Sequence, residues 1–403
     1  MFRELDKPWE DGIAKTITFI VTKDCQLACK YCYLVGKNVN ERMSFDTAKK
    51  AIDYILSQES IFRQKSVVWD FIGGEPFLEI ELIDKICDYI KEELYRRNHH
   101  WFDSYRFSFS TNGINYATDS VQRFIKKNRK HLSIGITIDG TKIKHDMNRV
   151  YKNSSRGSYD DVIKNIPLWL KQFNDEPATK VTISSSDIIY IKDSVLHLFS
   201  LGIHEVDINC VFEDVWESED DKLFEDQLMQ LADAIIDGNF YQNFACSFFN
   251  EHIGKPMDKI HDNQNWCGAG VMLSIDAAGN FYPCTRFAQY SLRDKQAWII
   301  GNVRDGIDKN KLRPFLTLDR CTQSTQECID CEVASGCAWC QGENYDAADT
   351  NTIYQRSTAI CKMHKARVRA NNYYWNKLYR KLELEGQREE FEKNKREVKP
   401  EIC

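Results

Sequence analysis

The first half of the chain alternates short β-branched stretches with longer segments of helical periodicity. Strand-like composition occurs at 17–22, 67–72, 106–110, 132–138, 180–184 and 205–211. Apolar residues at helical spacing separate these stretches, at 45–55, 78–96, 117–128, 159–173 and 192–201. Regular alternation of this kind predicts a parallel sheet, and six strand–helix units are too few for a complete eight-stranded barrel.

Local signals support several of these helices. Ser44 and Ser158 each stand directly before an apolar helical face, so we expect both residues to be N-caps. Cys87 falls on the apolar face of the helix expected at 78–96, which predicts a buried core residue.

The alternation stops after residue 214. Residues 215–262 are acidic at first and then aromatic, and we interpret them as a mostly helical bridging segment. A cysteine-rich region occupies 263–365, and 366–403 comprise a basic aromatic helix and a charged tail that we expect to fray. The predicted organisation is therefore 1–214, 215–262, 263–365 and 366–403.

Composition narrows the class of protein. The chain is 42% hydrophobic and 28% charged, with a net charge of −6 that indicates neither a nucleic-acid partner nor a membrane surface. The acidic, mixed N-terminus lacks the apolar core of a signal peptide, and no apolar run is long enough to span a bilayer. We expect a cytoplasmic protein.

Cysteine is unusually abundant for that compartment. Of 15 cysteines, three lie at 25–32 and eight lie between Cys267 and Cys361. Thiols are kept reduced in the cytosol, so clustered cysteines there favour metal binding over disulfides. The sequence therefore predicts two metal-binding regions, one towards each end of the chain.

The first region contains three cysteines without a fourth: Cys25, Cys29 and Cys32 in "TKDCQLACKYCYL". Three thiolates complete neither a tetrahedral zinc site nor a four-cysteine cluster. They can bind three irons of a [4Fe–4S] cluster and leave the fourth iron open to another ligand. The loop follows the first strand, at the carboxyl end of the parallel strands, where sites gather. A structural zinc loop with one distant ligand is the alternative.

A second motif follows the second strand. In "FIGGEPFL", Gly73 and Gly74 remove side chains where backbone approaches a ligand, Glu75 can accept a bond from an ammonium group, and Pro76 stiffens the turn. The triplet, with Tyr31 before its last cysteine, and this GGEP motif together resemble the radical S-adenosylmethionine (SAM) enzymes. The resemblance implies that SAM chelates the open iron, that GGEP holds its amino group, and that reductive cleavage gives a 5′-deoxyadenosyl radical.

Two further stretches extend the resemblance. "STNG" ends the third strand, and we expect Ser110 and Asn112 to border the cofactor as in the family; a plain turn is the alternative. In "ITIDGTKIKHDMNR" the resemblance implies that Thr137 and Arg149 contact the ribose and carboxylate of SAM. A planar guanidinium suits a carboxylate because it can bond both oxygens.

Asp139 and His145 in the same stretch could instead hold the loop in place.

The second cysteine region starts with "CGAGVMLSIDAAGNFYPC", which predicts a β-hairpin around "AAGN". It continues with C-x2-C-x5-C-x2-C. This order resembles the SPASM extension of peptide-modifying radical SAM enzymes, although the last gap is two residues here and three in the family. Two structural zinc knuckles are the alternative interpretation.

The SPASM resemblance implies two auxiliary [4Fe–4S] clusters, and three clusters in all. By position, cluster II would take Cys328, Cys331, Cys337 and Cys361, and cluster I would take Cys267, Cys284 and Cys340. The fourth ligand of cluster I would be Cys321, or the position would stay open and bind a substrate thiolate. The implied fold is a partial (β/α)6 TIM barrel followed by the SPASM domain.

The resemblance implies radical modification of a peptide. We favour a maturase that joins a cysteine sulfur to a carbon of an acceptor residue, giving a thioether in a ribosomally made peptide. The alternatives are an anaerobic sulfatase-maturating enzyme that makes formylglycine, or a maturase that forms carbon–carbon crosslinks. The sulfatase enzymes carry an aspartate proton acceptor where this chain has Thr285, and threonine cannot take up a proton at neutral pH. A third alternative is an iron–sulfur or zinc regulator that catalyses no reaction. The GGEP loop argues against it, because such a protein does not need a site for the SAM ammonium group.

The implied partners are a precursor peptide with a leader, and a reductant such as flavodoxin or ferredoxin. Only 24 residues precede Cys25, too few for an N-terminal leader-binding module. We therefore expect the bridging segment, the C-terminal helix or a separate protein to bind the leader.

Overall fold

A computed structural model describes residues 14–173, 177–265 and 267–394. The chain forms two compact units. The first comprises Met1–Ala28, Cys32–Gly135 and Gly268–Thr317, and the second comprises Cys29–Tyr31, Ile136–Cys267 and Leu318–Cys403. Each unit is described by itself.

The first unit is built on one sheet with the order β11-β10-β9-β8-β1-β2-β3-β4. Its leading strands are β1 (Lys15–Thr22), β2 (Val67–Gly73), β3 (Tyr105–Thr111) and β4 (Leu132–Ile136). The β1–β2, β2–β3 and β1–β8 pairs are parallel, as the alternating pattern predicted for the first strands. The other strands, β8 (Leu273–Ile275), β9 (Asn280–Tyr282), β10 (Gly301–Asn302) and β11 (Gly306–Ile307), pair antiparallel in sequence order.

Alternation along these strands separates two faces. Phe19, Trp69 and Phe71 are completely buried and stack on one another, with 5.6 Å between the ring centroids of Phe19 and Phe71. The opposite face of β2 is only half-buried and carries Asp70, whose carboxylate accepts a hydrogen bond from Thr18. One face of the sheet therefore forms a core, and the other presents polar groups.

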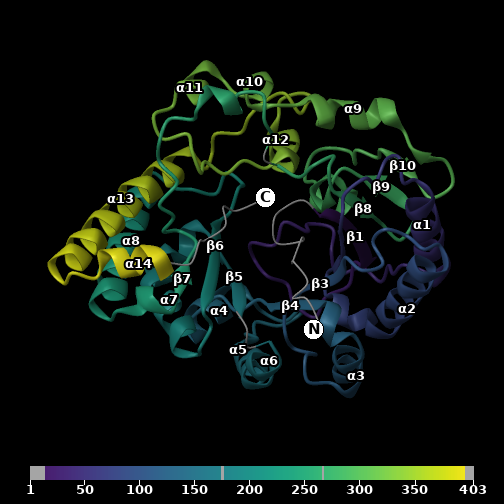
Figure 1. Cartoon of the computed structure of the whole chain (residues 1–403), viewed down its shortest axis with the longest axis horizontal. Helices are drawn as coiled ribbons and strands as arrows, with labels where there is room; N and C mark the ends of the chain where they lie inside the picture. Colours follow the sequence, from purple (N-terminus) through teal and green to yellow (C-terminus); the bar gives the residue numbers. More distant parts are fainter. Residues whose placement is uncertain (1–13, 174–176, 266, 395–403) are drawn as a thin grey trace. The chain divides into compact units, whose positions relative to one another are not determined.

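The helices α1 (Phe45–Ser57), α2 (Ile80–Arg96) and α3 (Asp119–Asn128) lie along one side of this sheet (Figure 1). The other helical segments of the first unit are η1 (Pro76–Glu79), η2 (Arg129–His131), η6 (Thr285–Phe287), η7 (Gln289–Ser291) and α9 (Lys309–Thr317). The predicted cap of α1 is confirmed, because the Ser44 hydroxyl accepts the Thr47 amide hydrogen. The predicted burial of Cys87 and the hairpin around the turn at 277–280 are also confirmed.

The second unit contains a three-stranded sheet of β5 (Ala178–Ile183), β6 (Glu205–Cys210) and β7 (Ala245–Cys246), paired in parallel. Its first helices are α4 (Lys142–Asn148), α5 (Tyr159–Ile163), α6 (Ile166–Gln172), η3 (Ser185–Tyr190), α7 (Ile191–Ser200), α8 (Asp220–Asp237), η4 (Phe240–Gln242) and η5 (Lys259–His261). Later helices are α10 (Arg320–Gln323), α11 (Gln326–Ile329), α12 (Gln341–Ala347), α13 (Cys361–Leu384) and α14 (Arg388–Asn394). The long helix α13 lies against α8 (Figure 1).

Three expectations were wrong in part. The helix expected over 159–173 is divided into α5 and α6, because Pro167 lacks the amide hydrogen that would continue the helix. The bridging segment contains one long helix, α8, and beyond it only the short helices η4 and η5 and strand β7. The tail forms α14 up to Asn394, because Phe391 packs edge-on against Tyr241; residues 395–403 lie outside the described part.

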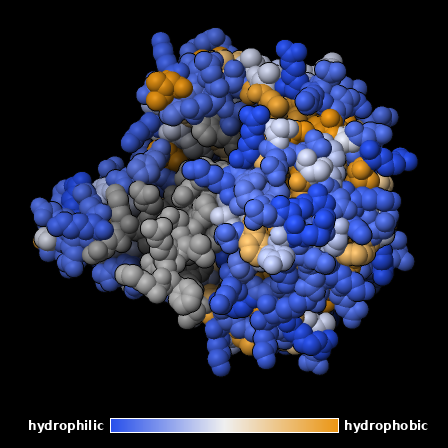
Figure 2. Space-filling view, turned by 45° about the vertical axis from the view of Figure 1, so that its right-hand side comes forward, coloured by the Kyte–Doolittle hydropathy of each residue, from blue (hydrophilic) through white to orange (hydrophobic). Residues whose placement is uncertain are grey.

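In the part of the chain that the structure describes, no helix is both long and apolar enough to cross a bilayer. The face seen in Figure 2 is mostly hydrophilic, with scattered hydrophobic side chains.

Candidate functional site

Cys25 lies in the loop that follows β1, in the first unit. Its sulfur is buried and accepts the Leu27 amide hydrogen at 3.3 Å, and the Asn112 side-chain nitrogen lies 3.9 Å away. Hydrogen-bond donors of this kind stabilise a sulfur that carries negative charge. Cys32 belongs to the same unit, whereas Cys29 belongs to the second.

The turn from Gly73 to Pro76 packs directly on the Cys25 loop. The amides of Gly74 and Glu75 donate to the carbonyl oxygens of Thr22 and Asp24, at 3.0 and 2.8 Å. A Cβ atom on Gly74 would lie 2.1 Å from the Asp24 carbonyl oxygen, so only glycine fits. The close approach expected of these glycines is therefore made to the chain's own cysteine loop.

Glu75 ties two strand ends together. Its buried carboxylate accepts hydrogen bonds from the Thr111 hydroxyl at 2.6 Å, the Asn112 amide at 2.8 Å and the Phe77 amide at 3.0 Å. The last of these bonds caps η1, whose first residue is the buried Pro76. Glu75 fixes the turn in the orientation that faces the Cys25 loop, and its bond to a SAM ammonium stays a prediction.

The sequence singled out Ser110 and did not mark Thr111. Thr111 is buried on the face that also carries Phe107 and Phe109, while Ser110 is exposed on the opposite face. The period of two in β3 could have assigned these faces. Asn112 also donates to Gln26 at 3.0 Å, which links the third strand to the cysteine loop.

In the second unit, Tyr31, Asp139 and Arg149 form a connected group. The Tyr31 hydroxyl donates to Asp139 and accepts a hydrogen bond from Arg149 Nη1 at 2.9 Å. Arg149 Nε and Asp139 Oδ1 are buried and have no hydrogen-bond partner among the described residues. A buried guanidinium nitrogen without a partner is costly, so this group is suited to a ligand that brings a carboxylate.

The charges in this group are fixed by their neighbours. Burial would raise the pKa of Asp139, but the charges of Lys144 and Arg149 lower it below its usual value, so the carboxylate stays ionised. Burial raises the pKa of Tyr31 well above its usual range, so the phenol remains a donor. Thr137 directly follows β4, belongs to the second unit and is half-buried.

His145 holds the loop, as one of the two interpretations proposed. Its Nδ1 accepts the Asp139 amide hydrogen at 3.3 Å, and its Nε2 bonds the Ser158 hydroxyl at 3.0 Å. Burial, with Arg149 nearby, lowers its pKa to about 3, so the ring is neutral. Ser158 in turn donates to the Arg149 carbonyl oxygen and makes no cap with its side chain, so the predicted capping role was wrong.

Four cysteines of the second region gather in the second unit. Cys328, Cys331, Cys337 and Cys361 line the same cavity of about 1210 Å³. Burial raises the pKa of Cys337, the Arg356 guanidinium opposes this, and the three neighbouring cysteines add to the increase. These four cysteines are the ones that the resemblance assigned to one cluster.

Two arginines that the sequence did not single out support this group. Arg356 donates to the Cys337 sulfur at 3.2 Å and to Ser324 at 3.0 Å, with its guanidinium over the Trp339 ring. Arg320 is buried and bonds the backbone carbonyls of Cys328 and Ile329. No spacing in the sequence signals either arginine, because both reach the cysteines only through the fold.

The remaining cysteines differ in exposure. Cys267 and Cys340 are buried in the second unit, Cys321 is exposed on α10, and Cys284 is half-buried in the first unit. Among the residues described, no two cysteines form a disulfide bond.

No group of three or more His, Cys, Asp or Glu side chains in the described ranges converges on a single-ion position.

Thr285 and Arg286 directly follow Cys284 in the first unit. The Thr285 hydroxyl lies 3.2 Å from that of Ser274, and the Arg286 guanidinium stacks 4.3 Å from the Tyr33 ring centre. Burial raises the pKa of Tyr33, with a smaller contribution from Asp70. Neither Thr285 nor Arg286 supplies a proton acceptor, although Asp70 contributes a carboxylate to the same surroundings.

Residues 19–193 match the model of the Radical SAM superfamily. This segment, a little under half of the chain, is similar to the radical SAM enzymes. This family implies SAM and a [4Fe–4S] cluster, and the buried Cys25 sulfur, the glycine turn and the unpartnered Arg149 nitrogen fit them.

Curated relatives include enzymes that modify proteins and peptides. The chain is 27% identical to an uncharacterised protein of Methanocaldococcus jannaschii, over 75% of this chain and 92% of that one. It is 25% identical to the serine-type anaerobic sulfatase-maturating enzyme of Bacteroides thetaiotaomicron, over 65% and 67%. It is 22% identical to the radical SAM cyclopropyl synthase TigE of Paramaledivibacter caminithermalis, over 88% and 73%.

Two solved structures share the fold. Native anSMEcpe with bound AdoMet superposes with a TM-score of 0.66 and 18% identity, covering 91% of this chain and 99% of that one. SuiB of Streptococcus suis bound to its precursor peptide SuiA gives a TM-score of 0.55 and 14% identity, covering 86% and 75%. Radical SAM enzymes of the maturase type therefore share this α/β fold.

Proposed function

We propose that this radical SAM enzyme forms a thioether in a ribosomally made peptide, between a cysteine sulfur and a carbon of an acceptor residue. The observation that carries the proposal is the second group of gathered thiols, Cys328, Cys331, Cys337 and Cys361. A chain that only cleaved SAM would need the first triplet alone. A second group of cluster ligands supplies a place for an electron released by the substrate.

The residues that would hold the cofactors follow from the two units. Cys25, Cys29 and Cys32 would bind the first cluster, and the GGEP turn, Ser110, Asn112, Tyr31, Thr137 and Arg149 would surround SAM. When bound and reduced, this pair supplies a 5′-deoxyadenosyl radical. Arg149 would hold the SAM carboxylate through its unpartnered Nε, and Glu75 keeps the turn pressed onto the Cys25 loop.

The reaction balances with the parts proposed. One hydrogen atom leaves the acceptor carbon for the radical, one proton leaves the cysteine thiol, and carbon and sulfur join. One electron is released in the same step. Auxiliary clusters bound by Cys328, Cys331, Cys337 and Cys361, and by Cys267, Cys284 and Cys340, would supply its acceptor.

Cluster I, the cluster assigned to Cys267, Cys284 and Cys340, needs a fourth ligand, and two arrangements would provide it. Either Cys321 fills the position or it stays open for the substrate thiolate. Cys321 is exposed on α10, whereas cluster ligands are commonly shielded from solvent, so its exposure favours the open position.

Formylglycine formation is the second candidate, and the similarity to the Bacteroides thetaiotaomicron enzyme favours it. That reaction needs a proton acceptor near the substrate, and Thr285 bonds Ser274 in place of the aspartate expected there. Carbon–carbon crosslinking is a third candidate, and the similarity to the cyclopropyl synthase TigE favours it.

The working organisation is a partial barrel at 1–214, a bridging segment at 215–262, a SPASM domain at 263–365 and a helix with a tail at 366–403. The partners are a precursor peptide with a leader and a reductant such as flavodoxin or ferredoxin, in the cytoplasm.

Mass spectrometry of the modified peptide tests the reaction. Incubation with SAM, reductant and short cysteine-bearing peptides encoded near the gene should give a product that has lost two hydrogen atoms and kept its sulfur. Alkylation should no longer label the crosslinked cysteine. A product that loses the cysteine sulfur, or reaction only with a sulfatase peptide, would support formylglycine formation instead.

A further inference from the structure

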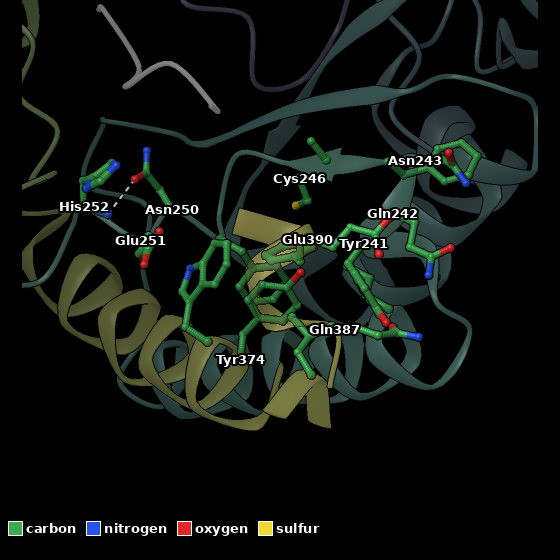
Figure 3. A pocket seen from close by; sticks show the side chains of 17 residues that line it. Tyr241, Gln242, Asn243, Cys246, Asn250, Glu251, His252, Tyr374, Gln387 and Glu390 are labelled. Carbon is green, nitrogen blue, oxygen red and sulfur yellow. Dashed lines mark hydrogen bonds between the residues drawn. The ribbon is translucent and has the colours of Figure 1, made fainter. Parts of the chain in front are cut away.

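A second cavity in the second unit has none of the predicted cluster cysteines in its lining, and it shares Asn250 and His252 with the cavity lined by Cys328, Cys331, Cys337 and Cys361. It has a volume of about 490 Å³ and lies between residues 241–252 and the helices α13 and α14 (Figure 3). Its wall combines the end of the bridging segment with the C-terminal helices, two segments that are far apart in the sequence.

Aromatic rings form the apolar part of its wall. Tyr374 stacks on Phe249 at 4.4 Å and meets Trp375 edge-on at 5.1 Å, while Phe391 packs edge-on against Tyr241 at 5.8 Å. Rings held against one another in this way present a rigid surface that can receive an apolar side chain at small entropic cost.

The polar part of the wall consists of amides and carboxylates. Gln242, Asn243 and Gln387 line the cavity, together with Glu251 and Glu390. Amide side chains can both donate to and accept from a peptide backbone.

Among the described residues, no lysine or arginine lines this cavity, and His252 is the one histidine in its wall. Two basic side chains of the same region have partners of their own: Lys381 bonds the Ile236 carbonyl and Asn239 and packs over the Tyr241 ring, and Arg388 pairs with Glu383 and Glu392. Glu390 is exposed on α14 and forms no hydrogen bond or ion pair with another described residue. The cavity is therefore acidic, and it is complementary to a basic group.

A strand edge runs along the same cavity. β7 is the last strand of its sheet, and Ala245 and Cys246 line the cavity. The amides of Ala245 and Ser247 donate towards β6, to the carbonyls of His204 and Val206. The other side of an edge strand is a surface on which an extended peptide can lie.

We propose that this cavity binds an extended segment of the precursor's leader in which a lysine or arginine stands beside apolar residues. The apolar side chains lie on the Tyr374 and Phe391 rings, the basic group meets Glu390, and the backbone runs along β7. This inference rests on the proposed function, since it assumes a peptide substrate. It assigns leader recognition to the bridging segment and the C-terminal helices acting together.

Binding is measured by fluorescence anisotropy on the full-length enzyme, without SAM or reductant. The probe is a fluorescein-labelled peptide of sequence Gly-Leu-Lys-Ile-Lys-Val-Gly-Ser, and its counterpart has glutamate in place of both lysines. Glu390→Lys should weaken binding of the basic probe by roughly fivefold, because a favourable charge pair becomes repulsive. Glu389→Lys is the matched control, because Glu389 is exposed in the same helical turn and lies outside the cavity.

Equal weakening by both substitutions, or equal binding of the two probes, would overturn the proposal. Hydrogen exchange on the unmodified enzyme gives a second readout that needs no variant. The basic probe should slow exchange in residues 241–252 and 387–391, and protection confined to other segments would contradict the proposal. A gain in affinity on deleting residues 395–403 would mean that the chain's own end occupies the cavity, which also overturns it.

Because no cofactor takes part, failure here leaves the proposed reaction untouched. Failure of the reaction with normal probe binding would count against the chemistry alone.

Discussion

Arg149 uses one guanidinium nitrogen for the Tyr31 hydroxyl and buries another without a partner. A SAM carboxylate would accept the hydrogen bond that the buried guanidinium nitrogen lacks. A lysine ammonium group could not replace arginine here, because it does not have the two parallel N–H donors of a guanidinium. Arg149→Lys should therefore weaken SAM binding by roughly tenfold or more. Isothermal titration of the reconstituted enzyme measures this change.

The control for that experiment is Arg156→Lys, which changes an exposed arginine that pairs with Asp161. It should leave SAM affinity unchanged, and iron content should be the same in both variants. Unaltered affinity in Arg149→Lys would remove Arg149 from the cofactor site.

Arg356 contacts a predicted cluster ligand, because its guanidinium donates to the Cys337 sulfur. Hydrogen bonds to ligand sulfurs stabilise the reduced, more negative state of a cluster. Arg356→Gln should shift one auxiliary reduction potential downwards by about 60 mV, the one-electron equivalent of about 1.4 kcal/mol. Redox titration followed by electron paramagnetic resonance measures the shift, and Arg356→Lys should restore part of it. Identical potentials in all three proteins would place Arg356 away from any cluster.

His145 makes stability depend on pH. Its pKa is lowered to about 3 in the folded chain, whereas an unfolded histidine titrates near 6.5. The unfolded state therefore binds more protons between those values, and stability falls as the pH falls below about 6.5. The contribution of this residue is at most about 1.4 kcal/mol per pH unit.

Thermal unfolding between about pH 5.5 and 7 checks this dependence. His145→Asn removes the titrating ring and should flatten the dependence of the midpoint on pH, while His100→Asn, at an exposed position, should not. An unchanged slope in His145→Asn would show that the ring is not buried in its neutral form.

At the scale of elements, the β2–η1 turn and the cysteine loop behave as one piece. A Cβ at Gly74 would strike the Asp24 carbonyl and approach the Cys25 side chain at 2.9 Å. Gly74→Ala should therefore displace the loop and lower the iron content after reconstitution. Gly386→Ala is the control, because nothing lies within 4 Å of its Cβ position, although its positive φ costs about 1 kcal/mol. Full iron loading in Gly74→Ala would separate the turn from cluster binding.

Most strands could be predicted because β-branched runs bounded by turns leave little alternative. The misassigned elements depended on single residues: Pro167 divides one helix, and Phe391 anchors a helix in a segment whose charge suggested fraying. A prediction from sequence follows the average composition of a segment, so a single residue has little influence on it. In the folded chain, one missing amide hydrogen or one contact between rings can decide where a helix begins or ends.

The site was predicted to the extent that its motifs are contiguous. Cys25, Gly74, Glu75 and Asn112 were all marked by sequence, and the structure joins them. Thr111, Arg320 and Arg356 were not, because their partners are distant in the chain and only folding brings them together.

At the scale of the whole molecule, two groups of cysteines serve one proposed reaction. The first triplet lacks a fourth thiol because SAM would take that position, and the second group of four would accept an electron. The similarity to SuiB and to anSMEcpe shows a shared fold, and it does not choose between thioether and formylglycine. The chemistry of the product makes that choice.

The central claim is that Cys25, Cys29 and Cys32 hold a cluster whose remaining iron receives SAM. Its most direct measurement is 5′-deoxyadenosine formation by the anaerobically reconstituted enzyme with SAM and dithionite, quantified by chromatography with mass detection. The native enzyme should release 5′-deoxyadenosine and methionine, and replacement of the three cysteines by alanine should abolish both while the auxiliary iron remains. Undiminished 5′-deoxyadenosine from the alanine variant, or none from a native enzyme with its iron fully loaded, would contradict the account.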